Sequence, residues 1–273
     1  MDANCLHDKA TIERYLRADA ELHIYSLGDL DDFFWPHTMW FGHETDGRLD
    51  AVVLLYVGMS VPTLLALSRG GDALPALVRS IAHLLPVRFN AHLSPGIASV
   101  LEPTHRLTAS GPHLKMSLDP TALCRNRPAA PPRADEGEGT AGEPCRLTTD
   151  DLPALLALYE ASYPENWFDP RMVETGQYFG IRDGTRLISA AGIHVYSPRY
   201  GVAALGNIAT LPSHRGRGFA ARVTERLCRS LADERITVGL NVRADNAAAI
   251  ACYRRIGFET VATYEELVVE RKR

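Results

Sequence analysis

The stretch GNIATLPSHRGRGFA, residues 206–220, decides which fold this chain is expected to adopt. Its apolar start with β-branched residues predicts a strand, and Pro212 marks the turn that follows. Gly216 and Gly218 alternate with arginines before a helical pattern begins at Phe219. Such a loop turns free backbone N–H groups, reinforced by the helix dipole, toward one point in space. That point suits an anion, most often a phosphate or a diphosphate.

The spacing Gly216-x-Gly218-x-x-Ala221 also fits the dinucleotide-binding fingerprint. That fingerprint places its first glycine at the strand end and an acidic residue about 20 positions later. Here five residues separate Thr210 from Gly216, and Glu234 lies before the next apolar run instead of at its end. These departures disfavour an oxidoreductase with a nucleotide cofactor. An ordinary glycine-rich turn with solvated arginines remains as a second alternative.

Grouped differently, the loop reads Arg215-x-x-Gly218-x-Ala220, which resembles the acyl-CoA-binding signature of the GNAT superfamily of N-acyltransferases. The resemblance implies that the backbone of Ile208, Ala209 and Thr210 pairs with the pantetheine arm of acetyl-CoA or another short acyl-CoA. It also implies that the diphosphate is held by Arg215, Gly216, Arg217, Gly218, Phe219 and Ala220. The two arginine side chains would add charge-assisted hydrogen bonds.

A second block follows about 25 residues downstream of the loop. The pattern Asn246-x-x-Ala-x-x-x-Tyr253-x-x-x-Gly257-Phe258 predicts a helix that begins near Asn246 and stops at Gly257. It resembles the second conserved block of GNAT enzymes. The resemblance implies that Asn246 contacts the cofactor and that the Tyr253 hydroxyl acts as general acid beside the CoA sulfur. A core tyrosine with a satisfied hydroxyl is the alternative interpretation of Tyr253.

Bulk composition limits the other functions that are open to this chain. The net charge is −4 and the isoelectric point is near 6.2, which gives no electrostatic case for nucleic acid or an anionic membrane. The five cysteines include no C-x-x-C pair and the ten histidines are dispersed, so we expect free thiols, no metal and a cytoplasmic location. Abundant alanine and arginine hint at a bacterial genome rich in GC.

The composition also indicates two domains. Residues 125–144 carry four prolines and three glycines but no large apolar residue, which predicts a linker. Residues 1–124 form the expected N-terminal domain and residues 145–273 the expected catalytic domain. In the latter, strands and helices follow in an α/β order with a mixed sheet, closing with a pair of strands between Phe258 and Glu270.

The N-terminal half echoes the strand, glycine loop and helix of the C-terminal half. Thr63–Leu67, the loop from Ser68 to Gly71 and Leu74–Leu85 repeat that order, but the loop has lost the Arg-x-x-Gly-x-Ala pattern. We therefore expect a degenerate GNAT-like copy that binds no CoA, in a tandem arrangement similar to glycine N-acyltransferase. An unrelated α/β or α+β domain is the alternative interpretation.

Acceptor and base residues are less clearly marked. Trp167, Phe168 and Asn207 are candidates for the acceptor site, with core packing as the alternative for the aromatic pair. His194 has a suitable unperturbed pKa near 6.5 for a general base, although a satisfied histidine within the sheet is also consistent with its position. Further candidates for the base are Glu165, Tyr196 and a water held by Asn207.

Together these features predict an N-acyltransferase that moves a short acyl group from acyl-CoA to a primary amine of a small molecule within a ternary complex. The chain would act as a monomer or a homodimer, with no nucleic-acid or membrane partner. The alternative function is a non-catalytic CoA-binding sensor or scaffold.

Overall fold

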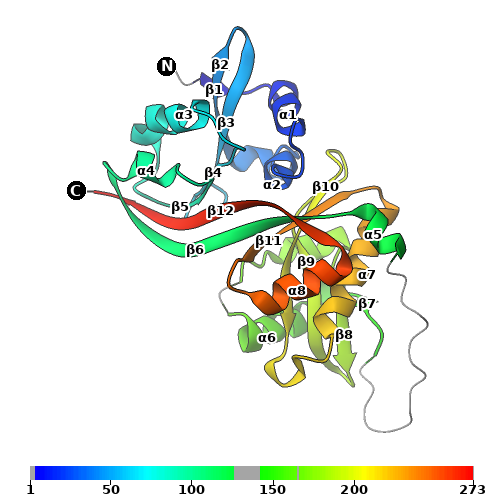
Figure 1. The fold of residues 1–273 in the computed structure, drawn as a ribbon. Helices are drawn as coiled ribbons and strands as arrows, with labels where there is room; N and C mark the ends of the chain where they lie inside the picture. Colours follow the sequence, from blue (N-terminus) through cyan, green and yellow to red (C-terminus); the bar gives the residue numbers. More distant parts are fainter. Residues whose placement is uncertain (1–3, 126–141, 165, 273) are drawn as a thin grey trace. The chain divides into compact units, whose positions relative to one another are not determined.

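The computed structural model describes residues 4–125, 142–164 and 166–272, and the chain divides into two compact units (Figure 1). Unit 1 comprises Met1–Met116, Val242–Asn246 and Thr260–Arg273, and unit 2 comprises Ser117–Asn241 and Ala247–Glu259. Most of the expected linker, residues 126–141, lies outside the described residues. None of the helices in the described ranges has the length and apolar character needed to span a bilayer.

Unit 1 contains a mixed sheet with strand order β1-β2-β3-β4-β5-β12-β6. Its strands are β1 (Asn4–Leu6), β2 (Thr38–Thr45), β3 (Arg48–Tyr56), β4 (Thr63–Ala66), β5 (Arg88–Leu93), β6 (His105–Leu118) and β12 (Phe258–Arg271). Its helices are α1 (Lys9–Arg17), α2 (Ile24–Gly28), α3 (Ala73–Ile81) and α4 (Ala98–Leu101), with 3₁₀ turns η1 (Trp35–His37) and η2 (Ala82–Leu84). Leu77 of α3 and Phe89 of β5 are fully buried in its core.

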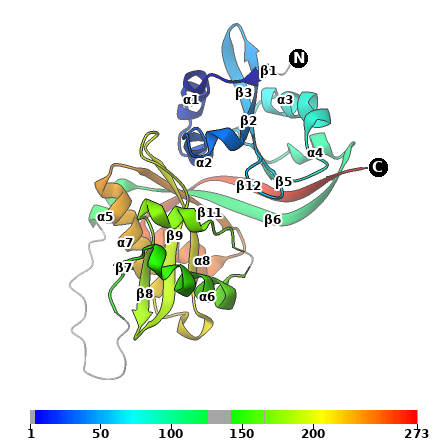
Figure 2. The same cartoon turned by 180° about the vertical axis from the view of Figure 1, so that it is seen from behind.

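The strands of unit 2 follow in the order β11-β10-β9-β8-β7, with parallel and antiparallel pairing. Figure 2 shows β7, β8 and β9 of this unit together with α6. Its strands are β7 (Cys145–Arg146), β8 (Phe179–Asp183), β9 (Arg186–Ser197), β10 (Val202–Thr210) and β11 (Thr237–Arg243). Its helices are α5 (Pro120–Arg125), α6 (Leu152–Ser162), α7 (Phe219–Asp233) and α8 (Ala247–Ile256), with 3₁₀ turns η3 (Thr149–Asp151), η4 (Pro170–Thr175) and η5 (Pro212–His214). The mixed α/β fold class expected from the sequence is confirmed.

The same supersecondary order occurs in both units. In unit 1, β4 leads through α3 to β5, which pairs parallel to β4 with Leu64 opposite Ala91. In unit 2, β10 leads through α7 to β11, which pairs parallel to β10 with Ala204 opposite Gly239. The repeat that the sequence indicated is therefore present in the backbone.

The C-terminal strand differs from the expectation. The predicted pair of strands between Phe258 and Glu270 is wrong, because the segment forms the single strand β12. No glycine, proline or asparagine interrupts it, so nothing in the segment favours a turn. β12 pairs antiparallel with β5, with Leu267 opposite Ala91, and its residues from Thr260 onward belong to unit 1.

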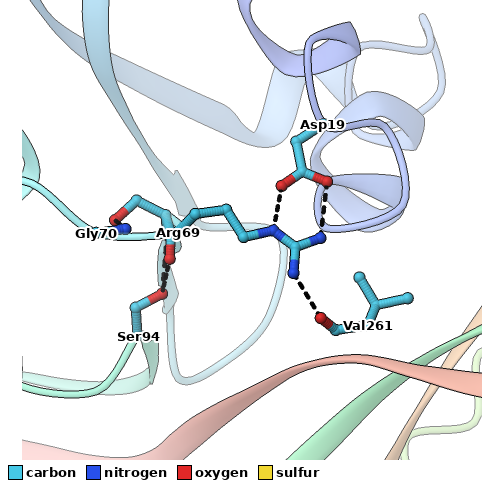
Figure 3. Close-up of polar contacts among 6 residues, drawn as sticks. Asp19, Arg69, Gly70, Ser94 and Val261 are labelled. Atoms are coloured by element: carbon cyan, nitrogen blue, oxygen red, sulfur yellow. Dashed lines mark hydrogen bonds and ion pairs between the residues drawn. The ribbon is translucent and has the colours of Figure 1, made fainter.

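Arg69 and Ser68 of the glycine loop of unit 1 form hydrogen bonds with other parts of that unit (Figure 3). The Arg69 guanidinium donates to both carboxylate oxygens of Asp19, at 2.5 and 3.1 Å, and to the carbonyl oxygen of Val261 at 2.6 Å. The Ser94 hydroxyl donates to the carbonyl oxygen of Ser68 and accepts from its N–H, both at 2.9 Å. The cationic group of this loop is thus engaged within the protein.

Candidate functional site

A glycine loop leads from β10 into α7. Gly216 and Gly218 have φ angles of +77° and +80°, in the left-handed region that favours glycine. A Cβ atom added to either residue would meet no heavy atom within 4 Å, so both backbones face open space. Gly218 caps α7 without a side-chain hydrogen bond. The first N–H groups of the helix are therefore available to an anion, and this part of the site fits a diphosphate.

The edge of β10 next to this loop is open. Parallel pairing between β10 and β11 runs from Val202 opposite Thr237 to Leu205 opposite Leu240. In the described part of the chain, residues 206–210 pair with β9 alone. The two parallel strands therefore separate toward the loop, and the separation leaves backbone groups of β10 without a strand partner on that side.

The ladder between β9 and β10 determines which groups face the opening. The N–H of Leu211 donates to the carbonyl oxygen of Ile188 over 2.9 Å. Successive residues of an antiparallel strand alternate in direction, so Ala209 faces β9 while Ile208 and Thr210 face the open side. Of the three residues that the sequence associated with pantetheine, two therefore have backbone groups on the open side of β10.

The arginines of the loop have structural partners. The Arg215 side chain donates from Nε to the carbonyl oxygen of Thr210 and from Nη2 to that of Ser162, both at 3.2 Å. The Arg217 guanidinium lies 5.1 Å from the ring centroid of Phe219, a cation–π contact. Arg215 thus ties the loop to the ends of β10 and α6.

Two irregularities of strand pairing lie beside the opening. β9 carries one extra residue, His194, between two consecutive pairs with β10. β10 carries one extra residue between Gly206 and Ala209, and Asn207 within it has a φ of +53°. A bulge redirects its side chain relative to the regular pleat. These two bulges bring the His194 and Asn207 side chains into contact.

Asn207 is the centre of a buried hydrogen-bond network. Its Nδ2 donates to the carbonyl oxygen of Trp167 at 3.2 Å and to Oη of Tyr178 at 3.1 Å. Its Oδ1 lies 3.3 Å from Nε2 of His194. Its own carbonyl oxygen accepts from the Tyr159 hydroxyl at 3.0 Å. Neither tyrosine was predicted as part of the site, because nothing local to either residue indicates a hydroxyl partner so distant along the chain.

His194 is held against a glycine. A Cβ atom at Gly206 would lie 2.3 Å from Cδ2 and Nε2 of the imidazole, so only glycine leaves room for the ring. Burial lowers the pKa of His194 below 6.5, and the hydrogen bond to Asn207 opposes this shift. The imidazole is therefore neutral at pH 7 and can accept a proton.

Tyr253 lies half-buried on α8. Its ring centroid is 5.9 Å from that of Phe258, with the rings 63° apart. Burial raises the pKa of the Tyr253 phenol, with smaller contributions in the same direction from Cys252, Tyr163 and Cys228. The phenol therefore keeps its proton throughout the physiological pH range, and Tyr163 is near enough to influence it. Asn246 lies exposed just before α8.

The segment after α6 has two kinds of aromatic residue. Tyr163 and Trp167 are 44% and 46% exposed and can meet a ligand. Phe168 is half-buried, with its ring centroid 5.0 Å from that of Tyr159 and 5.9 Å from that of Tyr178. Of the aromatic pair that the sequence proposed for the acceptor site, Trp167 is exposed to solvent and Phe168 packs on the tyrosines of the network.

The remaining candidates for the base lie elsewhere or are not described. The Tyr196 hydroxyl donates to the carboxylate of Glu234, the residue that caps the far end of α7 from the glycine loop. Burial, followed by the interaction with the Glu234 carboxylate, raises the pKa of Tyr196 to about 12. Glu165 lies outside the described residues. His194 is thus the candidate that the structure brings into the network around Asn207.

Comparison with known proteins agrees with this geometry. The sequence model of the Acetyltransferase (GNAT) family matches residues 146–258. N-alpha-acetyltransferase RimI of Mycobacterium tuberculosis is 33% identical over 118 residues, which cover 41% of this chain and 70% of that protein. Mycothiol acetyltransferase of Tsukamurella paurometabola is 33% identical over 101 residues, which cover 34% of this chain and 33% of that protein.

The fold of the whole chain also has a counterpart. A tandem GNAT protein from the clavulanic acid biosynthesis pathway superposes with a TM-score of 0.57 at 16% identity, and the match covers 98% of each chain. At that identity the likeness concerns the fold alone. It extends over both units.

Proposed function

Because this chain belongs to the acetyltransferase (GNAT) family, we propose that unit 2 transfers an acetyl or other short acyl group from acyl-CoA to the primary amine of a small molecule. The observation that carries the proposal is the open edge of β10 running into the uncapped N-terminus of α7. Acyl-CoA presents an extended arm with amide groups and a diphosphate, which are the two features that these backbone groups suit.

The binding residues follow from the direction of each backbone group. Ile208 and Thr210 would pair with the pantetheine arm, and the amides from Arg215 to Ala220 would hold the diphosphate. Fixing the arm in this way would place the thioester beside the acceptor amine. The bimolecular step then becomes effectively unimolecular, because both reacting groups are bound in one site. Asn246 is proposed to contact the cofactor from the start of α8.

The chemistry needs three protein groups. His194 takes the proton of the attacking amine as the nitrogen lone pair forms a bond to the thioester carbonyl carbon. The Ile208 N–H, on the open side of β10, donates a hydrogen bond to the resulting oxyanion. Tyr253 donates its proton to the thiolate when the C–S bond breaks. Solvent then returns a proton to Tyr253 and removes one from His194, so the products are an amide and free CoA.

The acceptor is proposed to lie against Trp167 and Tyr163, whose exposed rings follow α6. The related proteins are named for different activities, mycothiol acetyltransferase and N-alpha-acetyltransferase. Their names therefore leave two classes of acceptor to be compared, small amines and the N-termini of polypeptides. We favour a small amine and make the peptide an arm of the test.

The test measures acetyl-CoA binding by calorimetry and thiol release across a panel of amino acids, amino sugars and a peptide with a free N-terminus. We expect binding and turnover with a small amine, and we expect Gly218→Glu to abolish binding while the far-ultraviolet circular dichroism stays unchanged. Binding without thiol release from any amine would instead identify a CoA sensor. Unchanged affinity in Gly218→Glu would refute the binding site.

His194→Gln tests the base separately. Glutamine keeps a hydrogen-bonding side chain but cannot accept a proton at neutral pH. We expect kcat to fall at least about tenfold and the acid limb of the kcat/KM profile to disappear, since that limb reports the base of the free enzyme. A profile that keeps its acid limb at the same pH would assign the base to another group.

A further inference from the structure

We propose that Asn207 is a positioning residue that holds His194 as the Nε2–H tautomer, so that Nδ1 is the atom that takes the proton from the amine. The role of Nδ1 in catalysis rests on the proposed function. The tautomer itself follows from the hydrogen-bond network and can be tested without any substrate.

The orientation of the Asn207 amide is determined by its partners. The carbonyl oxygen of Trp167 carries no hydrogen, so the group that faces it at 3.2 Å must be Nδ2. The single hydrogen of the Tyr178 hydroxyl is donated to the carbonyl oxygen of Ile193 at 2.9 Å. Tyr178 must therefore accept from Nδ2 at 3.1 Å. Both Nδ2 hydrogens are then used, and Oδ1 is the atom that faces His194.

The tautomer follows from the remaining contact. Oδ1 can only accept, so Nε2 of His194 at 3.3 Å must carry the hydrogen. A neutral imidazole has one N–H, which leaves a lone pair on Nδ1. Among the described residues none forms a hydrogen bond with Nδ1, and the half-buried ring presents its Nε2 side to Gly206. Nδ1 is thus free to receive a proton.

The groups around His194 keep its imidazole neutral, so that it can accept a proton. Burial lowers its pKa, and the titratable side chains of the network are the Tyr178 phenol before β8 and the Tyr159 phenol on α6. Burial raises the pKa of both phenols, so they carry no charge at neutral pH. Asn207 has one further effect during turnover: when Nδ1 gains the amine proton, Oδ1 still accepts from Nε2–H and stabilises the imidazolium.

The backbone offers a clean pair of variants. Asn207 has a φ of +53°, which glycine, asparagine and aspartate tolerate better than other residues. Asn207→Gly removes the amide and keeps the backbone conformation. Asn207→Asp keeps an acceptor for Nε2–H and adds a negative charge, which raises the pKa of His194. The two variants therefore differ in whether Nε2–H has an acceptor, while both tolerate the backbone conformation of the bulge.

The test is a long-range ¹H–¹⁵N correlation spectrum of the protein labelled with [¹⁵N]histidine, with His194→Gln identifying the resonance among ten histidines. We expect the Nε2–H tautomer in the wild type and in Asn207→Asp, and a mixture of tautomers in Asn207→Gly. We also expect kcat to fall at least about tenfold in Asn207→Gly. The acid limb of kcat/KM should move to higher pH in Asn207→Asp.

Each result decides one part of the inference. An Nδ1–H tautomer in the wild type, or an unchanged tautomer in Asn207→Gly, would overturn the positioning role. The expected tautomers together with unchanged acid limbs in both variants would overturn the catalytic role of Nδ1 alone. Absence of any thiol release from the wild type would remove the proposed function and leave the tautomer standing, so the two failures are distinguishable. Thermal melts of all variants show whether the unit remains folded.

Discussion

Replacing Gly218 by alanine separates backbone strain from ligand binding. Gly218 has a φ of +80°, where an L-residue costs about 1–2 kcal/mol. A Cβ atom there meets nothing within 4 Å in the protein, so no clash adds to this cost. We therefore expect Gly218→Ala to stay folded with a Tm lowered by about 2–8 °C, since about 1 kcal/mol corresponds to 2–4 °C in a domain of this size.

The effect on acetyl-CoA should be larger. The added methyl group takes the open space through which a phosphate oxygen would approach the amides at the start of α7. One charge-assisted hydrogen bond contributes about 1.5–3 kcal/mol. Because about 1.4 kcal/mol is tenfold in affinity, the Kd measured by calorimetry should rise about 10- to 150-fold.

Gly184 provides the matched control within the same unit. It has a φ of +57°, and a Cβ atom there also meets nothing within 4 Å. It lies in the turn between β8 and β9, away from the glycine loop along the chain. Gly184→Ala should therefore lose similar stability and keep its Kd. Equal Kd values for Gly218→Ala and the wild type, or an equal loss in both variants, would refute the assignment of the diphosphate to this loop.

Three further outcomes follow from the two units. Tyr253→Phe should lower kcat at least about tenfold in steady-state assays while the Kd for acyl-CoA stays within about twofold; unchanged turnover would remove the acid role. Calorimetry should give one acetyl-CoA per chain, and Arg69→Ala should keep that ratio while lowering the Tm, because it leaves the Asp19 carboxylate without its cation; a ratio of two would contradict a non-binding first unit. Burial raises the pKa of Asp29 to about 8, so the folded state holds a proton that the unfolded state releases above about pH 4, and stability falls as the pH rises from there. Asp29→Asn should therefore melt at a higher temperature than the wild type at pH 9 and near the same temperature at pH 4; a constant difference across this range would refute the buried neutral carboxyl.

Local sequence patterns predicted the parts of the site that a short segment builds alone. The glycine loop is one such part, because Gly216 and Gly218 adopt left-handed φ angles that their residue type favours in many contexts. The helix Ala247–Ile256 is another, with its start near Asn246 and its stop at Gly257 both readable from residue type. Such features depend on interactions within a few residues.

The hydrogen-bond partners of His194 could not be predicted from local sequence patterns. Asn207 is 13 positions away and Tyr178 contacts Asn207 across 29 positions. The contact also needs two bulges, one in each strand, and strand periodicity carries no information about an inserted residue. A histidine in an apolar strand therefore remained ambiguous until its hydrogen-bond partner was known.

Residue types and spacings within single segments were enough to predict the glycine loop before α7, the helix that carries Tyr253 and the mixed α/β class. The pairing of β12 with β5, the bonds from Arg69 to Asp19 and Val261, and the contact between Asn207 and His194 became visible only in the folded chain. These arrangements join segments far apart in the chain. Their hydrogen bonds form only where folding has already brought the segments together and excluded water, so no local pattern encodes them.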